Sequence, residues 1–360
     1  MKLNFFRALI LGILVATLVV PAAPLQAMEP RQSGQQSGQQ QPPKRPPEPQ
    51  PSQDQYAISV DVPLVNVDVV VTDNNGNFIP GLKKENFRIL EDGAPQAISN
   101  FAPTEAPITV VLLIEFSKLA YQYFAYQSTQ WSQVFLNYLG KDDWVALVSF
   151  DLKSTIEVDF TKNKSEVQSY LARMYFPNFT EASLFSAVVD TTDRLKDVKG
   201  KKAIVLVASG IDTHLGKHTL DDALKALRQT DVTIFSVGVG RDFFEYLDAR
   251  GAIGSSTRMD FYQAQNQMNA FARMTGGKAW YPRFQGEIPG IFREVAAHLR
   301  NQYSVGYIPA NQKRDGKVRK IKVELVGQDG SPLIMIDQNR KQVKYQVYAR
   351  EGYVVPKGVT

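Results

Sequence analysis

Four uninterrupted apolar stretches constrain this chain more than any other feature. They are 109–114 (TVVLLI), 145–150 (VALVSF), 203–208 (AIVLVA) and 232–239 (VTIFSVGV). Such stretches lack the alternation of a half-exposed strand and therefore fit strands buried on both faces. Between them, apolar residues recur at helical spacing, as at Leu220, Ala223, Leu224 and Leu227. The sequence predicts an α/β fold with a mainly parallel sheet covered by helices.

Two further apolar stripes predict helices on the same sheet. The first consists of Tyr121, Phe124, Ser128, Trp131, Phe135, Tyr138 and Leu139, and the second of Ile288, Ile291, Phe292, Val295 and Leu299. Pro289 falls in the first turn of the second helix, where a missing amide donor costs little.

The two ends of the folded region have a different period. Val65, Val67, Val69 and Val71 alternate mostly with polar residues, and the turn sequence DNNGN follows at 73–77. Tyr303, Val305 and Tyr307 alternate in the same way, as do Val343, Tyr345 and Val347. This period of two is typical of antiparallel strands. We expect segments 56–107 and 301–356 to pack together as a β-sandwich-like unit, with an α/β domain at 108–300 inserted between them.

The first 55 residues predict export. Lys2 and Arg7 precede a short apolar run, and small residues follow up to Ala27, which is the order of a secretory signal peptide at 1–27. We expect the mature protein to begin between Gln26 and Pro30, and an uncleaved anchor is the alternative. Segment 28–55 is rich in Gln and Pro and is expected to be a disordered linker. The expected location is the periplasm, the cell surface or the medium.

Charge and cysteine content exclude several classes of protein. The net charge is only +5, from 41 basic and 36 acidic residues, and there is no cysteine for a disulfide or a lipid anchor. A local basic cluster, which alternates with apolar residues, is interpreted as the solvated face of a hairpin; it consists of Lys313, Arg314, Lys317, Arg319, Lys320 and Lys322. Binding of nucleic acid or of an anionic surface is the alternative interpretation of this cluster, and the expected partners do not include nucleic acid.

The residues that follow the apolar stretches are the candidates for function. Ligands of open α/β sheets bind beyond the carboxyl ends of the strands. Here those positions hold 115–119 (EFSKL), 178–184 (NFTEASL) and 209–214 (SGIDTH).

The order of these segments resembles a von Willebrand factor A domain. The resemblance is carried by VVLLIEFSKL, KAIVLVASGIDT, VTIFSVGVG and MTGGKAWYP. The flanking sequences VNVDVVVTDNNGNFIPGLKKENFRILEDG and LRNQYSVGYIPANQKRDGKVRKIKVEL resemble the von Willebrand factor A-related proteins of Acidobacteria. The resemblance covers nearly all of 58–353.

In that family, the metal-ion-dependent adhesion site holds a cation, usually magnesium, with a D-x-S-x-S loop, a threonine and a second aspartate. At the corresponding positions this chain has Glu115, Ser117, Leu119, Ala182 and Ser209. Leu119 and Ala182 lack the expected oxygens and Ser209 lacks the expected charge, so a magnesium ion would find too few ligands. Thr180, Glu181 or Asp212 would supply replacements only if the loops took another path. The resemblance therefore implies a degenerate site with no metal and no cofactor.

Partner binding is accordingly expected at six loop residues: Glu115, Ser117, Thr180, Glu181, Ser209 and Asp212. The alternative is a local structural role, in which Ser117 and Ser209 satisfy backbone groups and Glu115 pairs with Lys118 or another cation.

The sequence does not indicate catalysis. Ser209 lacks the glycine that precedes a nucleophile elbow, and its nearest histidines, His214 and His218, lie in its own loop. Gly238 and Gly240 give only half of a dinucleotide-binding loop. We therefore expect a non-catalytic, exported protein-interaction or adhesion module that binds a protein or a cell-envelope polymer. A structural component of an envelope assembly is the main alternative; a metal-dependent adhesin or a hydrolase that uses Ser209 is less favoured. The oligomeric state is left open.

Overall fold

The computed structural model describes residues 64–104, 107–118, 126–174, 176–213, 216–336 and 340–357. These residues belong to one compact unit of the chain. The predictions about the signal peptide, its cleavage and the linker lie outside the described residues, as do Leu119, Tyr121, Phe124 and His214. Within the described ranges, no helix has the length and apolar character needed to cross a membrane.

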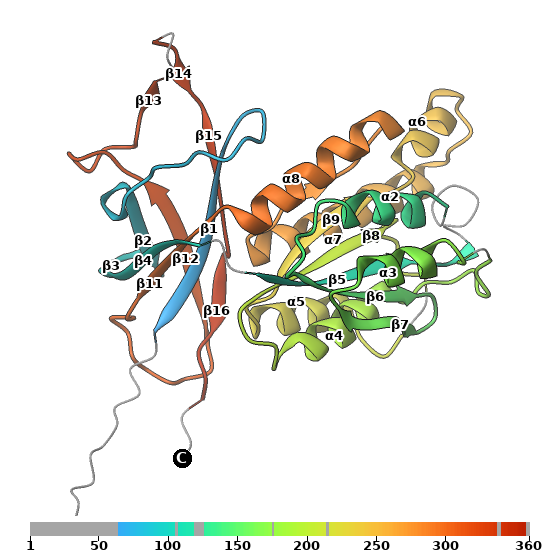
Figure 1. The fold of residues 1–360 in the computed structure, drawn as a ribbon, viewed down its shortest axis with the longest axis horizontal. Coiled ribbons are helices and arrows are strands. Elements are labelled where there is room, and N and C mark those ends of the chain that lie inside the picture. The colour runs from blue at the N-terminus through green and yellow to red at the C-terminus, as the bar shows by residue number, and fades with distance from the viewer. Residues whose placement is uncertain are drawn as a thin grey trace, which may run out of the picture. The chain divides into compact units, whose positions relative to one another are not determined.

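A six-stranded sheet forms the centre of the α/β domain, in the order β10-β9-β8-β5-β6-β7 (Figure 1). The four apolar stretches are its main strands: β5 (Ile108–Glu115), β6 (Trp144–Phe150), β8 (Lys201–Ala208) and β9 (Thr233–Gly238). All of these run parallel, as does the short β10 (Ala279–Trp280), whereas the edge strand β7 (Ser154–Thr161) is antiparallel to β6. The predicted fold class, a mainly parallel α/β sheet accompanied by antiparallel β segments, is confirmed.

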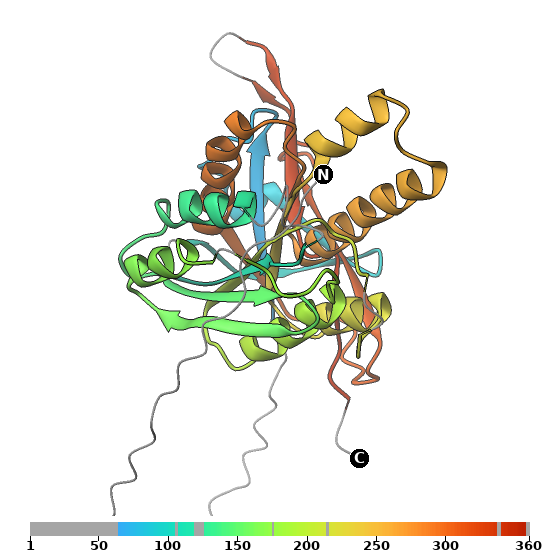
Figure 2. The ribbon, with the colours of Figure 1, turned by 90° about the vertical axis from the view of Figure 1, so that its right-hand side faces the viewer.

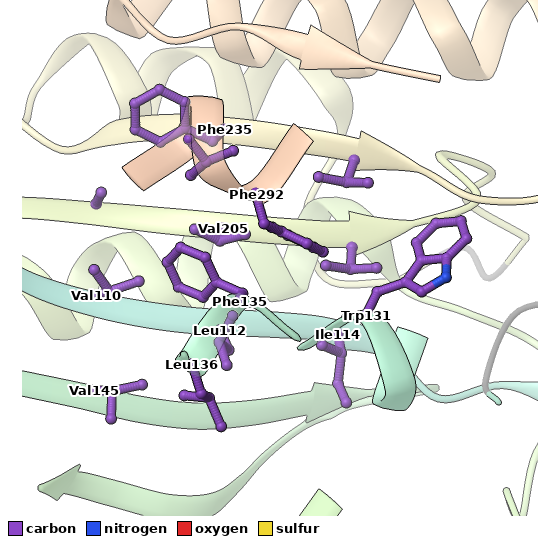
Figure 3. Packing of buried hydrophobic residues seen from close by; sticks show 14 of the residues in the cluster. Val110, Leu112, Ile114, Trp131, Phe135, Leu136, Val145, Val205, Phe235 and Phe292 are labelled. Atoms are coloured by element: carbon purple, nitrogen blue, oxygen red, sulfur yellow. The ribbon is translucent and has the colours of Figure 1, made fainter. Parts of the chain in front are cut away.

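Helices cover both faces of this sheet. α2 (Tyr126–Leu136), α3 (Lys164–Leu171) and α8 (Ile288–Arg300) pack on one face. Figure 3 shows Phe135 of α2 and Phe292 of α8 meeting above the central strands, with ring centroids 5.5 Å apart. α4 (Leu184–Leu195), α5 (Leu220–Arg228) and α7 (Ser255–Thr275) contribute to the core on the other face.

Local signals explain where some of these helices begin. Thr219 and Asp222 form a capping box at the start of α5, in which each side chain bonds the other residue's backbone N–H. Pro289 lies in the first turn of α8, as the sequence predicts. α6 (Arg241–Ala249) and the first half of α7 form a projecting hairpin, drawn in gold in Figure 2. Phe244 and Phe261 hold this hairpin together with ring centroids 3.7 Å apart.

The terminal segments together build two antiparallel sheets. The first has the order β15-β1-β11-β4 and consists of β1 (Val65–Asp73), β4 (Ile98–Thr104), β11 (Gln302–Tyr307) and β15 (Tyr345–Ala349). The second has the order β16-β12-β2-β3 and consists of β2 (Phe87–Glu91), β3 (Ala94–Gln96), β12 (Val318–Leu325) and β16 (Gly352–Val354). β13 (Met335–Ile336) and β14 (Gln342–Val343) form a small separate ribbon.

One apolar core joins these two sheets. It includes Val67 and Val69 of β1, Ile89 of β2 and Tyr303 of β11. β1 pairs with β11 on one side and with β15 on the other, so both neighbours of this strand come from the far end of the chain.

The interpretation of the basic cluster as one solvated face of a hairpin is wrong in two respects. β12, which carries Arg319, Lys320 and Lys322 of the cluster, pairs with β2 and β16, and neither is its neighbour along the chain in a hairpin. Arg319 is buried and donates to the Asp315 carboxylate at 3.2 Å. Arg319 alternates with Lys320 along the strand, so it lies on the side of Ile321 while Lys320 and Lys322 are exposed.

Candidate functional site

The central parallel strands bring two of the predicted loops together. β5 ends at Glu115, β8 ends one residue before Ser209, and the two strands are hydrogen-bonded neighbours in which Ile114 pairs with Val207. Residues that follow neighbouring parallel strands meet at the same sheet edge, so Glu115, Ser117 and Ser209 lie close together.

Glu115 directs its carboxylate inward and is almost fully buried, with 1% of its surface exposed. The hydroxyl of Ser117 donates to its Oε1 at 2.9 Å. The backbone N–H and the hydroxyl of Ser209 both donate to its Oε2 at 2.7 Å. Both carboxylate oxygens are therefore engaged by the protein itself.

The electrostatic environment of Glu115 favours its protonated form. Burial raises the pKa of this carboxyl, and the nearby Asp212 charge acts in the same direction. The hydrogen bonds from Ser209 and Ser117 oppose this increase. Lys118 is exposed, and among the ion pairs of the described residues none joins it to Glu115, so the predicted alternative of a Glu115–Lys118 pair is not observed.

The loop after β8 is fastened to the start of α4. Asp212 accepts a hydrogen bond from the backbone N–H of Phe185 at 3.1 Å, in the first turn of that helix. Thr213 bonds Ala182 twice, through its side-chain oxygen at 2.8 Å and its backbone N–H at 3.0 Å. Asp212 therefore stabilises the amino end of a helix, where negative charge is favoured.

Thr180 and Glu181 differ from the other predicted residues because both are exposed. They follow Phe176 and Phe179, whose exposed fractions are 76% and 43%. The carbonyl of Phe179 accepts a hydrogen bond from the Lys118 N–H at 2.6 Å, so this loop lies beside the one that follows β5. We refer to residues 176–181 as the aromatic loop.

Sequence reasoning missed the two phenylalanines of the aromatic loop. The available signal was a pair of aromatic residues, close to Pro177 and Asn178, outside any periodic segment. Large apolar side chains in a solvent-facing loop often mark a contact surface.

The sequence of the α/β domain matches a known protein family. Residues 109–272 match the sequence model of the von Willebrand factor type A domain. This segment is a von Willebrand factor type A domain. The whole sequence matches no curated protein.

Solved structures of low sequence identity resemble the chain. The conserved hypothetical protein BatB from Bacteroides thetaiotaomicron is 13% identical, with 53% of this chain and 98% of that chain covered and a TM-score of 0.38. An aerotolerance-related membrane protein from Bacteroides fragilis NCTC 9343 is 12% identical over 53% and 98%, with a TM-score of 0.41. A von Willebrand factor type A structure from Catenulispora acidiphila is 10% identical over 79% and 73%, with a TM-score of 0.40.

The side chains at the expected metal position of the type A domain do not fit a magnesium ion. Glu115 has both oxygens engaged, and Ala182, at the expected threonine position, is fully buried and offers no side-chain oxygen. No group of three acidic, histidine or cysteine side chains within the described ranges is placed to hold a metal. A divalent cation would therefore compete with the hydrogen bonds that Ser117 and Ser209 donate to the buried carboxylate of Glu115.

Ser209 has a partner that differs from that of a hydrolytic serine. Its hydroxyl donates to Glu115 and accepts from the Ile211 N–H at 3.2 Å. Among the hydrogen bonds of the described residues, none joins Ser209 to His218 or His298. His298 is buried in α8, where it packs against Phe235.

Gly238, the last residue of β9, and Gly240, which precedes α6, serve the packing of the domain. A Cβ at Gly238 would lie 2.4 Å from the ring of Tyr281. Gly240 has a φ of 87° and precedes the first residue of α6, a left-handed conformation that favours glycine. Each glycine therefore has a local structural explanation.

Proposed function

We propose that this chain is an exported, non-catalytic protein-interaction or adhesion module with a degenerate metal-ion-dependent adhesion site. The observation that carries the proposal is a contrast between buried polar side chains and an exposed aromatic loop at the carboxyl edge of the type A domain. Glu115, Ser117 and Ser209 bond one another inside the protein, whereas the aromatic loop is exposed. A partner would therefore contact apolar and polar side chains directly, without a bridging cation.

The sequence pattern of 1–27 supports export. The proposed partner is a protein or a cell-envelope polymer. Amino-terminal sequencing of the protein recovered from the cell envelope should give a start between Gln26 and Pro30. Recovery of Met1 or Lys2 at the start would instead indicate that the apolar run is retained as an anchor.

The absence of a functional metal site is tested by thermal denaturation with and without magnesium. A ligand stabilises a fold only when its concentration exceeds its dissociation constant, so millimolar magnesium should leave the melting temperature unchanged. The combined substitutions Glu115→Asp, Leu119→Ser, Ala182→Thr and Ser209→Asp should create a magnesium-dependent increase. Micromolar magnesium binding by the unmodified chain, abolished by Glu115→Ala, would establish a metal-dependent adhesin instead.

The contact surface is tested by affinity capture from envelope extract. Phe176→Ser together with Phe179→Ser should abolish capture of a specific partner if the aromatic loop is the contact surface. A matched control is Phe284→Ser, because Phe284 is 64% exposed but lies before α8, outside the aromatic loop. If deletion of 31–53 abolishes capture and the aromatic-loop variant does not, the alternative of a structural envelope component is favoured.

A further inference from the structure

A groove lies where the outer face of β12 approaches the carboxyl ends of α5 and α7. Its volume is about 650 Å³. Its apolar lining includes Leu90 of β2, Val318 of β12 and Met274 of α7, and Val318 is 45% exposed. α5 and α7 end here next to the amino edge of the central sheet, since β9 begins soon after α5. The groove is therefore separate from the aromatic loop, which lies at the carboxyl edge.

The rim of this groove is cationic. Arg228, Lys320 and Lys322 contribute three positive charges, and among the described residues of the lining Glu351 is the one acidic residue. Glu351 is already paired with Arg273 at 3.0 Å. Lys322 lies 2.8 Å from Glu324, but the side chains of Arg228 and Lys320 form no ion pair within the described part of the chain. The groove thus presents at least two uncompensated cations beside an apolar floor.

The strand geometry produces this combination from the basic stretch of the sequence. Successive side chains of β12 alternate between its two faces, so Val318, Lys320 and Lys322 point away from the sandwich core while Arg319 and Ile321 point into it. On the neighbouring strand, Leu90 pairs with Lys322 and extends the outward surface. An apolar side chain is therefore flanked by ammonium groups on the same face.

From this surface we propose that the groove binds an extended acidic peptide segment of a protein partner. Carboxylates of the peptide would lie beside Arg228, Lys320 and Lys322, and an apolar side chain between them would cover Leu90, Val318 and Met274. Complementary charge gives such an interface its orientation and specificity, and the apolar contact excludes water. Single-stranded nucleic acid is a poorer fit, because its bases stack on aromatic side chains and the lining residues that the structure describes include none.

The probe for this proposal is a fluorescein-labelled peptide that repeats Glu-Glu-Leu, measured by fluorescence anisotropy with the full chain. It should bind, and a Glu-Glu-Ser repeat and a Lys-Lys-Leu repeat should bind at least about tenfold more weakly. Increasing the salt concentration from about 0.1 to 0.5 M should weaken binding, because it screens the exposed charges of the rim.

Charge-reversal variants test whether the probe binds at this groove. Lys320→Glu with Lys322→Glu should weaken binding of the Glu-Glu-Leu probe by about tenfold or more, because two attractive contacts become repulsive. Lys313→Glu with Lys317→Glu changes the net charge equally outside the groove and should leave the affinity within about twofold. Circular dichroism would verify that all variants are folded.

Three results with the acidic probes would overturn the proposal. They are absence of binding at millimolar probe, equal effects of the two charge-reversal pairs, and equal affinity for the Glu-Glu-Leu and Glu-Glu-Ser repeats. Tighter binding of a labelled oligothymidine, lost in the Lys320→Glu and Lys322→Glu variant, would also refute it and assign the groove to nucleic acid.

Discussion

Replacing Glu115 with glutamine should stabilise the protein at neutral pH. The carboxylate is buried, and three hydrogen bonds from Ser117 and Ser209 hold it in place. A glutamine of the same shape can direct its oxygen toward Ser209 and its NH₂ toward the hydroxyl of Ser117. It therefore retains the hydrogen bonds without placing a charge in the protein interior.

The magnitude follows from two opposing contributions. Burying an ion costs several kcal/mol, whereas each hydrogen bond to a charged group contributes about 1 kcal/mol more than a neutral one. Because burial raises the pKa of Glu115 in spite of its hydrogen bonds, the cost of burial is the larger. We expect Glu115→Gln to increase the free energy of unfolding at pH 7 by ~1–2 kcal/mol. Glu115→Ala should decrease it by ~2–4 kcal/mol, because both serines lose their buried partner.

The pH dependence provides a second readout. The folded pKa of Glu115 lies above the ordinary value of 4.5, so the folded state binds more protons than the unfolded state in the window above 4.5. The contribution of Glu115 to stability is therefore present at low pH and is lost as the pH rises through that window. Glutamine does not titrate, so its advantage should grow from pH 5 to pH 7.5.

Urea denaturation followed by circular dichroism measures both effects. Samples of the wild type and the two variants would be compared at pH 5 and pH 7.5. The reasoning is refuted if Glu115→Gln destabilises the protein as much as Glu115→Ala at pH 7.5. It is also refuted if the difference between Glu115→Gln and the wild type does not change with pH.

Three further predictions concern the rest of the fold. Burial lowers the pKa of His298 to about 3, so the contribution of neutral His298 to stability is lost as the pH falls below the ordinary pKa of 6.5. Calorimetry between pH 6.5 and 4 should therefore show a smaller loss of stability for His298→Phe than for the wild type. A fragment 56–299 lacks both strands that pair with β1 and should associate through the exposed edges of that strand. Sedimentation should show that the fragment 108–300 is monomeric. A monomeric, cooperatively melting fragment 56–299 would contradict this prediction. Gly277→Ala places a Cβ 2.0 Å from a carbonyl oxygen of β9 and should lower the free energy of unfolding by ~2 kcal/mol or more in urea melts. The control Gly290→Ala, in open space on α8, should change the free energy of unfolding little or raise it by up to ~1 kcal/mol. Equal effects of the two substitutions would show that the close contact at Gly277 does not determine stability.

The sequence predicted the main strands of the central sheet because their burial is visible in the apolar composition of each segment. β5 and β8 are covered on both faces, so nearly every position must be apolar, and the pattern is visible without any partner. β7 was missed because it is an edge strand with only Val158 well buried, and its residues carry no continuous apolar signal. α7 was missed for a related reason, since its first half projects with α6 and is mostly exposed.

The candidate site was partly predictable. Parallel topology indicates that residues after the buried strands share one sheet edge, and the resemblance to a von Willebrand factor A domain implied that Glu115, Ser117 and Ser209 belong to one site there. It does not indicate that the Glu115 carboxylate turns inward and accepts from both serines, nor that Asp212 caps α4. Those outcomes depend on side-chain directions, which a spacing argument does not contain.

The sequence by itself determined the alternation of β12, but only the tertiary structure decided how its charged side chains are compensated. A period of two puts Arg319 on the side of Ile321 and Leu325, opposite Lys320, and it does not show what surrounds a guanidinium there. Pairing with β2 and β16, from distant parts of the chain, settled the question. It placed Arg319 beside Asp315 and left Lys320 on the outer face, because a buried guanidinium is stable only where a carboxylate is available to compensate its charge.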